Sequence, residues 1–222
     1  MNSKSNTGLL FAFLVISAWF ACLFFLLTWN FSWSNPLTYL MMFVQMHLYT
    51  GLFITAHDAM HGTVSPSTKL NFFIGQVCTA LYAAFPFNKL YKKHHEHHRH
   101  VHSKLDPDYH DGNFFSWYLK FLREYLSAWQ ILAMAIAFNV LKIWFSEINL
   151  ILFWVLPPLL STLQLFYFGT WLPHHGSHSN SHHSRTQAKN HLLAFFTCYF
   201  FGYHYEHHES PWMPWWLLWK TK

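Results

Sequence analysis

Histidine is the residue whose number and spacing in this sequence could do chemistry. The chain holds 19 histidines among 222 residues, more than its 14 Lys and Arg or its 9 Asp and Glu. Eight of them form three short motifs, which are His57 with His61, His94 with His97 and His98, and His204 with His207 and His208. Residues three or four apart lie on one face of a helix, so each motif can present its imidazoles together.

Neutral imidazole is the commonest protein ligand for metals, and sets of nitrogen ligands suit zinc, copper, iron or nickel. A ninth ligand is available from His174 or His175, and the sequence leaves open which of the two supplies it. Nine imidazoles are too many for one ion, so the motifs predict two metal ions. Chance pairing or a pH-sensing surface would not require a repeated triplet. We expect solvated loop positions for His178, His182 and His183. Five others should be structural or should support the metal ligands from outside, namely His47, His100, His102, His110 and His191.

Acidic residues lie within or beside these motifs. Glu96 and Glu206 fall inside the two triplets, Asp58 lies within the first motif, and Asp108 closes a short turn that begins at Asp106. Such carboxylates can orient imidazoles as outer acceptors, or they can be ordinary solvated groups, and the sequence does not separate the two. Asp58 and Asp108 are the candidate catalytic residues.

The elements that position these motifs are predicted to be apolar helices. Hydrophobic residues make up 53% of the chain and charged residues 10%, where a soluble domain carries about 25% charged residues. This composition excludes a disordered chain and predicts one all-α integral membrane domain over residues 1–222. A span needs roughly 20 apolar residues, and we expect about four, at residues 9–29, 37–56, 127–145 and 149–172.

Two segments depart from simple spans. Residues 71–87 are apolar but short and interrupted, which fits a re-entrant or interfacial helix pair better than a span. Pro157 and Pro158 should kink the fourth span. The three cysteines are scattered through apolar stretches and imply no disulfide framework.

The distribution of positive charge predicts an orientation. With the N-terminus in the cytoplasm, residues 58–126 and 173–222 hold 8 and 4 of the 14 Lys and Arg, as the positive-inside rule expects. Nearly all the histidines then lie on the cytoplasmic face of the membrane. We interpret the net charge of +5 as the result of positive residues gathered in the cytoplasmic segments. Nucleic-acid binding does not explain it, because the chain has no basic stripe or motif typical of that function.

The residues around the histidines resemble the membrane fatty-acid desaturase and hydroxylase superfamily and, within it, the bacterial β-carotene ketolases. The segments that carry the resemblance are 55–62, 94–98, 106–110, 168–174, 203–208 and 211–216. It covers about residues 40–110 and 160–218. One position departs from the family pattern, because the Leu-Pro-His segment is followed by His175 instead of arginine.

The resemblance implies a non-haem diiron centre that uses O2, in the inner membrane of a bacterium. The iron ligands carried over are His57, His61, His94, His97, His98, His174, His204, His207 and His208. Two hydroxylations at C4 of a β-ionone ring and loss of water would convert β-carotene to echinenone and then canthaxanthin. The substrate would be a carotenoid dissolved in membrane lipid. Because the chain has no flavin or nicotinamide fingerprint, a separate donor, plausibly a ferredoxin, must supply electrons.

Alternative functions remain open from the sequence. A carotenoid hydroxylase or an acyl-lipid desaturase would use the same metals, and only the residues flanking the histidines favour a ketolase. A metal transporter or sensor would place ionisable residues along its spans, where His47 and Lys142 are the main candidates here. The cations Lys92, Lys93 and Arg99 could dock an acidic donor, although a solvated positive loop is the better explanation for them.

Overall fold

The computed structural model describes residues 6–222, and every regular element among them is helical. The all-α prediction is therefore confirmed. The first half contains α1 (Thr7–Thr28), α2 (Pro36–Met60), α3 (Thr68–Ala83), α4 (Phe87–His100), α5 (Phe114–Tyr125) and α6 (Ala128–Leu141). One continuous irregular helix follows, made of α7 (Glu147–Leu150), η1 (Ile151–Val155), α8 (Leu156–Phe166), η2 (Tyr167–Trp171) and α9 (Leu172–His174). The last part contains α10 (His191–Cys198), α11 (His204–Glu209), α12 (Trp215–Leu218) and η3 (Trp219–Thr221).

Three helices are long and apolar enough to cross a membrane, namely α1, α2 and the continuous helix Glu147–His174. Many large apolar side chains on them face outward, and on α1 the rings of Phe13 and Phe24 are 66% and 65% exposed. Apolar surface of this extent is costly in water and suits lipid. The molecule is thus built as a membrane protein, while its number of crossings stays a prediction.

Two helix pairs are sharply bent. Residues 71–87 lie almost wholly in α3, which meets α4 at 103°. The bent pair therefore spans residues 68–100, and the re-entrant or interfacial placement of residues 71–87 stays a prediction. The predicted span 127–145 differs from the structure, because α6 has only 14 residues and rises about 21 Å. It joins α5 at an angle of 82°, and only the two together have the length of a span.

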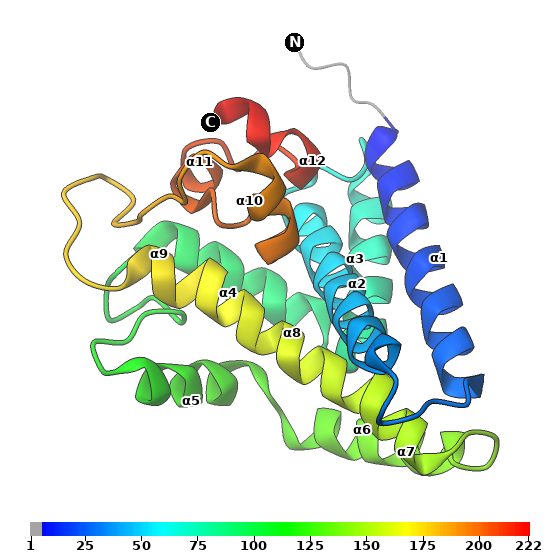
Figure 1. Cartoon of the computed structure of the whole chain (residues 1–222). Helices are drawn as coiled ribbons and strands as arrows, with labels where there is room; N and C mark the ends of the chain where they lie inside the picture. The colour runs from blue at the N-terminus through cyan, green and yellow to red at the C-terminus, as the bar shows by residue number, and fades with distance from the viewer. Residues whose placement is uncertain (1–5) are drawn as a thin grey trace.

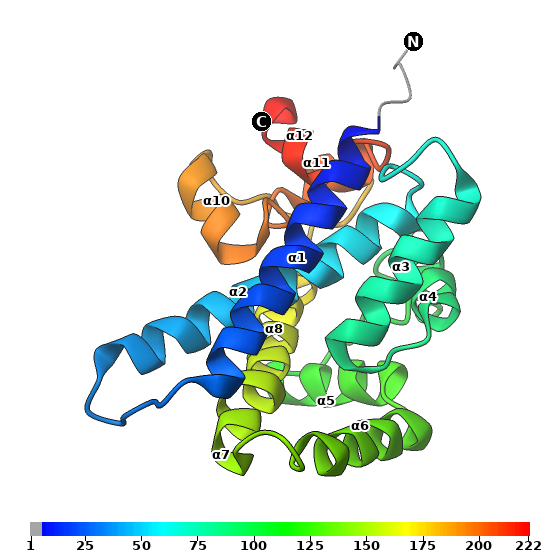
Figure 2. The ribbon, with the colours of Figure 1, turned by 90° about the vertical axis from the view of Figure 1, so that its right-hand side faces the viewer.

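The arrangement gathers the histidine-bearing ends at one region of the molecule. Figure 2 shows α6 and α7 at the opposite end from α11 and α12. In Figure 1, α8 crosses α2 and leads through η2 to α9. The start of α1 contacts α12, where the ring of Phe11 lies 4.8 Å from that of Trp216 and 5.5 Å from that of Trp215.

Prolines explain the irregular long helix. Pro158 has no N–H, so the carbonyl of Trp154 four residues earlier loses its ordinary donor. The wide turn of η1 precedes this proline, and the hydroxyl of Tyr49 on α2 donates to the Trp154 carbonyl (3.3 Å). The second wide turn, η2, precedes Pro173 in the same way. The helix thus changes its winding on the N-terminal side of Pro157 and Pro158 but continues as one helix from Glu147 to His174, so the kink itself stays a prediction.

Polar side chains join the helices inside this apolar body. Thr50 of α2 lies 2.8 Å from the hydroxyl of Ser161 on α8, and the Tyr82 hydroxyl of α3 donates to Ser161 at 3.0 Å. Asn149 is buried and its side-chain amide donates to the carbonyls of Leu26 and Trp29 at 2.9 and 2.8 Å. Asn149 thereby caps the end of α1, whose last carbonyls have no partner within their own helix.

We predict that Asn149→Ala destabilises the protein by about 1–3 kcal/mol, because it removes the donor from partly buried carbonyls at the end of α1. Thermal unfolding in detergent measures the effect. Asn139→Ala is the control, since Asn139 is exposed and donates only to Ala135 of its own helix. Equal unfolding midpoints for the two variants would contradict the capping role of Asn149.

Candidate metal centre

Four separate parts of the chain bring the nine predicted histidines together. The end of α2 supplies His57 and His61, and α4, α9 and α11 supply the others. All three motifs lie on helices or at their ends, as their spacing predicts. The positions from α4, α9 and α11 are His94, His97, His98, His174, His204, His207 and His208.

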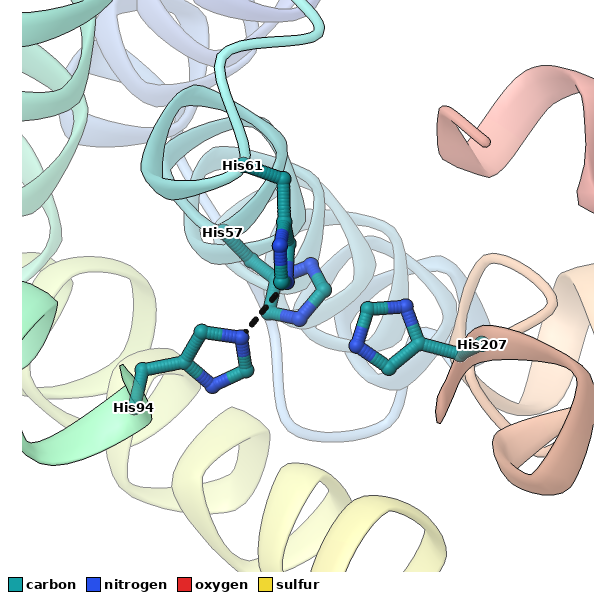
Figure 3. Close-up of side chains that lie close together, drawn as sticks. All are labelled: His57, His61, His94 and His207. Atoms are coloured by element: carbon teal, nitrogen blue, oxygen red, sulfur yellow. Dashed lines mark hydrogen bonds between the residues drawn. The ribbon is translucent and has the colours of Figure 1, made fainter. Parts of the chain in front are cut away.

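The first cluster contains His57, His61, His94 and His207. One ring nitrogen of each lies within 4.8 Å of one nitrogen of every other member. The Nε2 atoms of His61 and His94 are 2.7 Å apart. Figure 3 shows these rings converging on a shared space from α2, α4 and α11.

The second cluster contains His97, His174, His204 and His208, all of them buried. The Nε2 atom of His208 lies 3.2 Å from that of His97 and 3.0 Å from that of His204. The Nε2 atoms of His174 and His204 are 2.9 Å apart. This cluster uses one histidine of α9 that no repeated motif contains.

His98 lies between the two clusters. Its Nε2 atom is 3.1 Å from Nε2 of His207 in the first cluster, and its ring is 4.4 Å from the ring of His208 in the second. The nine histidines therefore divide into four, four and one that borders both groups. This division is the one expected of two neighbouring metal ions.

The electrostatics favour neutral imidazoles. Burial, reinforced by the neighbouring histidines, holds the pKa of His204, His207 and His208 well below the ordinary value for histidine. Neutral rings keep a lone pair, which is the form that binds a metal. Desolvation therefore prepares these residues as ligands at neutral pH.

The geometry also fits metal ions. Ring nitrogens about 2.0–2.1 Å from an ion and at right angles to each other lie about 3 Å apart, close to the separations between the clustered nitrogens. Among residues 6–222, the buried Nε2 of His57 has no hydrogen-bond partner. An unpartnered buried nitrogen is costly, and a metal ion would satisfy it.

Hydrogen bonds at the opposite ring nitrogens orient two of the candidate ligands. His97 donates from Nδ1 to Asp106 (2.9 Å), and His174 donates from Nδ1 to the carbonyl of His183 (2.9 Å). Asp106 also accepts the backbone N–H groups of His102 and Asp108. Burial alone would raise the pKa of Asp106, but these hydrogen bonds lower it. A charged Asp106 fixes the tautomer of His97 and makes its ring more basic.

The two candidate catalytic aspartates occupy different surroundings. Asp108 borders the large cavity described below and accepts a hydrogen bond from the hydroxyl of Tyr125. Its pKa is raised, chiefly by burial. Asp58 is buried, accepts the backbone N–H of Trp215 at 3.0 Å and lies 3.7 Å from Nδ1 of His57. These contacts suit Asp58 to holding α12 and His57 in place, and the catalytic role of either residue stays a prediction.

The structure distinguishes His174 from His175. His174 points into the second cluster, whereas His175 is exposed and stacks on Trp171, with ring centroids 4.6 Å apart. Sequence reasoning missed the loop that follows them. His182 of that loop donates to Glu209 (2.8 Å), and its ring lies 5.7 Å from that of His208.

Spacing gave no signal for these loop contacts, because they join residues of a Ser- and Asn-rich segment to α9 and α11. Of the two glutamates within the triplets, Glu96 is exposed, and Glu206 accepts from Lys222 at 2.9 Å instead of from an imidazole. The orienting carboxylate that the structure provides is Asp106, which sequence reasoning had considered without choosing it.

A cavity of about 610 Å³ leads from the histidines into the apolar body. His57, His94, His97 and His204 border its inner end. Its other walls are mostly apolar side chains from α3 to α6 and from η1 to η2. The ring of Phe201 lies 4.9 Å from that of His57. It occupies the place where any side chain on Gly169 would lie, which explains the glycine.

Comparison with known proteins agrees with this arrangement. Residues 32–139 match the family model described as fatty acid desaturase. A zeaxanthin 4-ketolase of Chlamydomonas reinhardtii is 42% identical over 185 residues, which cover 79% of this chain and 42% of the relative. A β-carotene 4-ketolase of Protosiphon botryoides is 43% identical over 201 residues, which cover 84% of this chain and 51% of the relative. A β-carotene ketolase of Paracoccus sp. (strain N81106 / MBIC 01143) is 36% identical over 215 residues, which cover 94% of this chain and 89% of the relative.

The chain thus spans about half the length of the first two relatives and most of the Paracoccus protein. No solved structure matches it significantly.

We predict that Asp106→Asn weakens metal retention roughly 10- to 100-fold, because an amide cannot accept from His97 and from two backbone N–H groups at once. Chelator competition and elemental analysis of the purified protein measure this. Asp111→Asn is the control, since the side chain of Asp111 is 87% exposed. Unchanged retention in Asp106→Asn would show that this carboxylate does not support the centre.

Proposed function

This chain belongs to the β-carotene ketolases of the fatty acid desaturase superfamily, and we propose that it oxidises ring methylene groups of a carotenoid to ketones. The observation that carries the proposal is the pair of histidine clusters at the inner end of an apolar cavity. Imidazoles alone offer no redox chemistry, and an apolar cavity suits a substrate that dissolves only in lipid.

We propose that the nine clustered histidines hold two iron ions. When bound, such a diiron centre supplies the activation of O2 that protein side chains cannot provide. Non-haem iron is commonly bound by imidazole, although nitrogen ligands alone also suit zinc or copper. The family membership favours iron, because diiron chemistry is what the desaturase resemblance implies.

The proposed reaction takes place twice at C4 of a β-ionone ring. In each round one O2, two electrons and two protons convert a C–H bond to C–OH and release one water. The second round gives a geminal diol, which loses water to form the ketone. Oxidation of the first ring would convert β-carotene to echinenone, and repetition on the second ring would give canthaxanthin. The electrons come from a separate donor of the ferredoxin type.

The protein's own residues bind, orient and exclude water in this proposal. Asp106 and the His183 carbonyl keep His97 and His174 in the tautomers that bind metal. The apolar walls around Phe201 exclude bulk water from the reacting ring, which limits side reactions. Asp108 is the one carboxyl group on the cavity wall, so it is our candidate for contact with the polar group formed on the ring.

We place the histidine clusters on the cytoplasmic side of a bacterial inner membrane. The excess of Lys and Arg in residues 58–113, which precede α5, and in residues 173–222 supports this orientation. In the proposed topology residues 1–222 form one domain, in which α1, α2, the bent pair α5–α6 and the helix Glu147–His174 each cross the membrane. The pair α3–α4 stays on the histidine side as a re-entrant hairpin.

We predict that expression in a β-carotene-accumulating bacterium yields pigments in which each modified ring has gained one oxygen and lost two hydrogens. Chromatography with mass spectrometry and the red-shifted absorption of a conjugated ketone measure this. Rings that gain oxygen without losing hydrogen would indicate a carotenoid hydroxylase. Unchanged β-carotene, with inserted protein and a competent donor present, would favour an acyl-lipid desaturase.

Adjacent histidines offer a matched test of the ligand assignment. We predict that His174→Ala loses bound iron and lowers ketone formation more than about 100-fold, since removing a ligand should cost more than removing an outer partner. His175→Ala should keep both, because His175 is exposed and lies outside the clusters. Iron analysis and pigment analysis are made on the same membranes. Full activity in His174→Ala would remove this residue from the proposed ligands.

A further inference from the structure

The apolar cavity reaches the molecular surface along a slot between α6 and the η1–α8 segment. Six of its lining residues are exposed, and the remaining ones are buried or half-buried. All six belong to these helices or directly precede α6. They are Leu126, Ile131, Ala135, Asn139, Ile151 and Leu159.

Two facing rows form the rims of the slot. On α6 the row is Ile131, Ala135 and Asn139, which are four residues apart and therefore lie on one face of the helix. On the other side Ile151 of η1 and Leu159 of α8 are the exposed lining residues. The exposed part of the cavity wall is therefore made by α6 and the η1–α8 segment, and the same cavity is bordered by the histidines.

The slot opens toward lipid. The outer face of α6 is apolar and exposed, with Trp129, Leu132 and Ile136 at 80%, 47% and 56% of full exposure. On the opposite rim Leu159 is 59% exposed. Surface of this kind is stable only against hydrocarbon or another apolar partner, so the mouth of the cavity faces the bilayer interior.

We propose that the carotenoid enters sideways from the bilayer through this slot, and that its outer half stays between the rims while the inner ring is oxidised. The inference rests on the proposed function and adds the route and the residues that select the substrate. A carotenoid is a stiff polyene with a ring at each end. When one ring lies at the histidines, the rest of the molecule must leave the cavity in a nearly straight line, and the slot provides that exit.

Ala135 has the smallest side chain on the α6 rim, and its methyl group leaves room in the slot that a larger side chain would fill. The start of this rim is fixed, because Gln130 donates to the carbonyl of Ala83 (2.7 Å) and Lys89 donates to that of Tyr125 (2.8 Å). A large residue at 135 should therefore narrow the slot instead of displacing α6. Ala133 on the same helix is also exposed but does not border the cavity, which makes it the matched control.

The test compares wild type, Ala135→Trp and Ala133→Trp, each produced in β-carotene-accumulating cells and purified in detergent. The readouts are the molar ratio of total carotenoid retained per protein, the iron content and the fraction of the retained pigment that is oxidised. We expect Ala135→Trp to lower the retained ratio and the oxidised fraction on the order of tenfold while keeping iron. Ala133→Trp should match wild type. Equal behaviour of the two variants, whether both lose or both keep β-carotene, would overturn the inference.

A second pair covers the case in which Ala135→Trp loses iron and has therefore misfolded. Leu159→Trp narrows the opposite rim, and Leu163→Trp, exposed on the same helix outside the cavity, is its control. Retention of β-carotene separates this inference from the proposed function. Wild type that retains β-carotene without oxidising it would refute the proposed ketolase activity. Carotenoid retention that neither rim substitution lowers would refute the proposed entry through the slot.

Discussion

The constraint on which the rest of the structure depends is the packing of nine histidines, six of them buried and three half-buried, around one small space. A charged imidazole in such surroundings faces both desolvation and its neighbours' charges, so most of these rings are held neutral, and their nitrogens need partners. His97 is the exception, because Asp106 and Asp108 raise its pKa. Protein acceptors satisfy some of the ring nitrogens, as Asp106 does for His97 and the His183 carbonyl does for His174. Nitrogens such as Nε2 of His57 have no partner among residues 6–222. A bound metal ion would complete the cluster.

Convergence of the clusters requires helices that end in defined places. The end of α2 and the helix α4 present the first two motifs. Because these helices are regular, the spacing of the histidines alone puts them on one face. Regular helical spacing is not enough to place His174. The long helix from Glu147 changes its winding before His174 reaches the second cluster. Two wide turns before prolines provide this change, and the Tyr49 hydroxyl partners a carbonyl left free by Pro158. Helical irregularity is therefore part of the site's geometry.

The sequence predicts much of this and fails in specific places. Helical spacing identifies three motifs, and composition identifies an all-helical membrane protein. Asp106 could not be preferred over Asp108, because the turn that aims its carboxylate at His97 depends on backbone N–H groups folding back onto it. The span expected at 127–145 is the shorter α6, since apolar composition does not reveal the 82° bend after α5. The choice of His174 over His175 required three-dimensional contacts.

The short α6 has a consequence for how a lipid-soluble substrate can reach a polar centre. A full-length span packed along α8 would seal the cavity on that side. α6 is only 14 residues long, and Gln130 is its one buried residue, so it borders the cavity without filling the space toward α8. The same helix presents apolar side chains outward, which lets lipid cover the opening. In the proposed function, a closed inner end with ordered imidazoles and an open side toward hydrocarbon would satisfy two opposing needs. The metal ligands would have to be rigid and shielded from water, while a long apolar substrate would have to enter, leave and present its second ring.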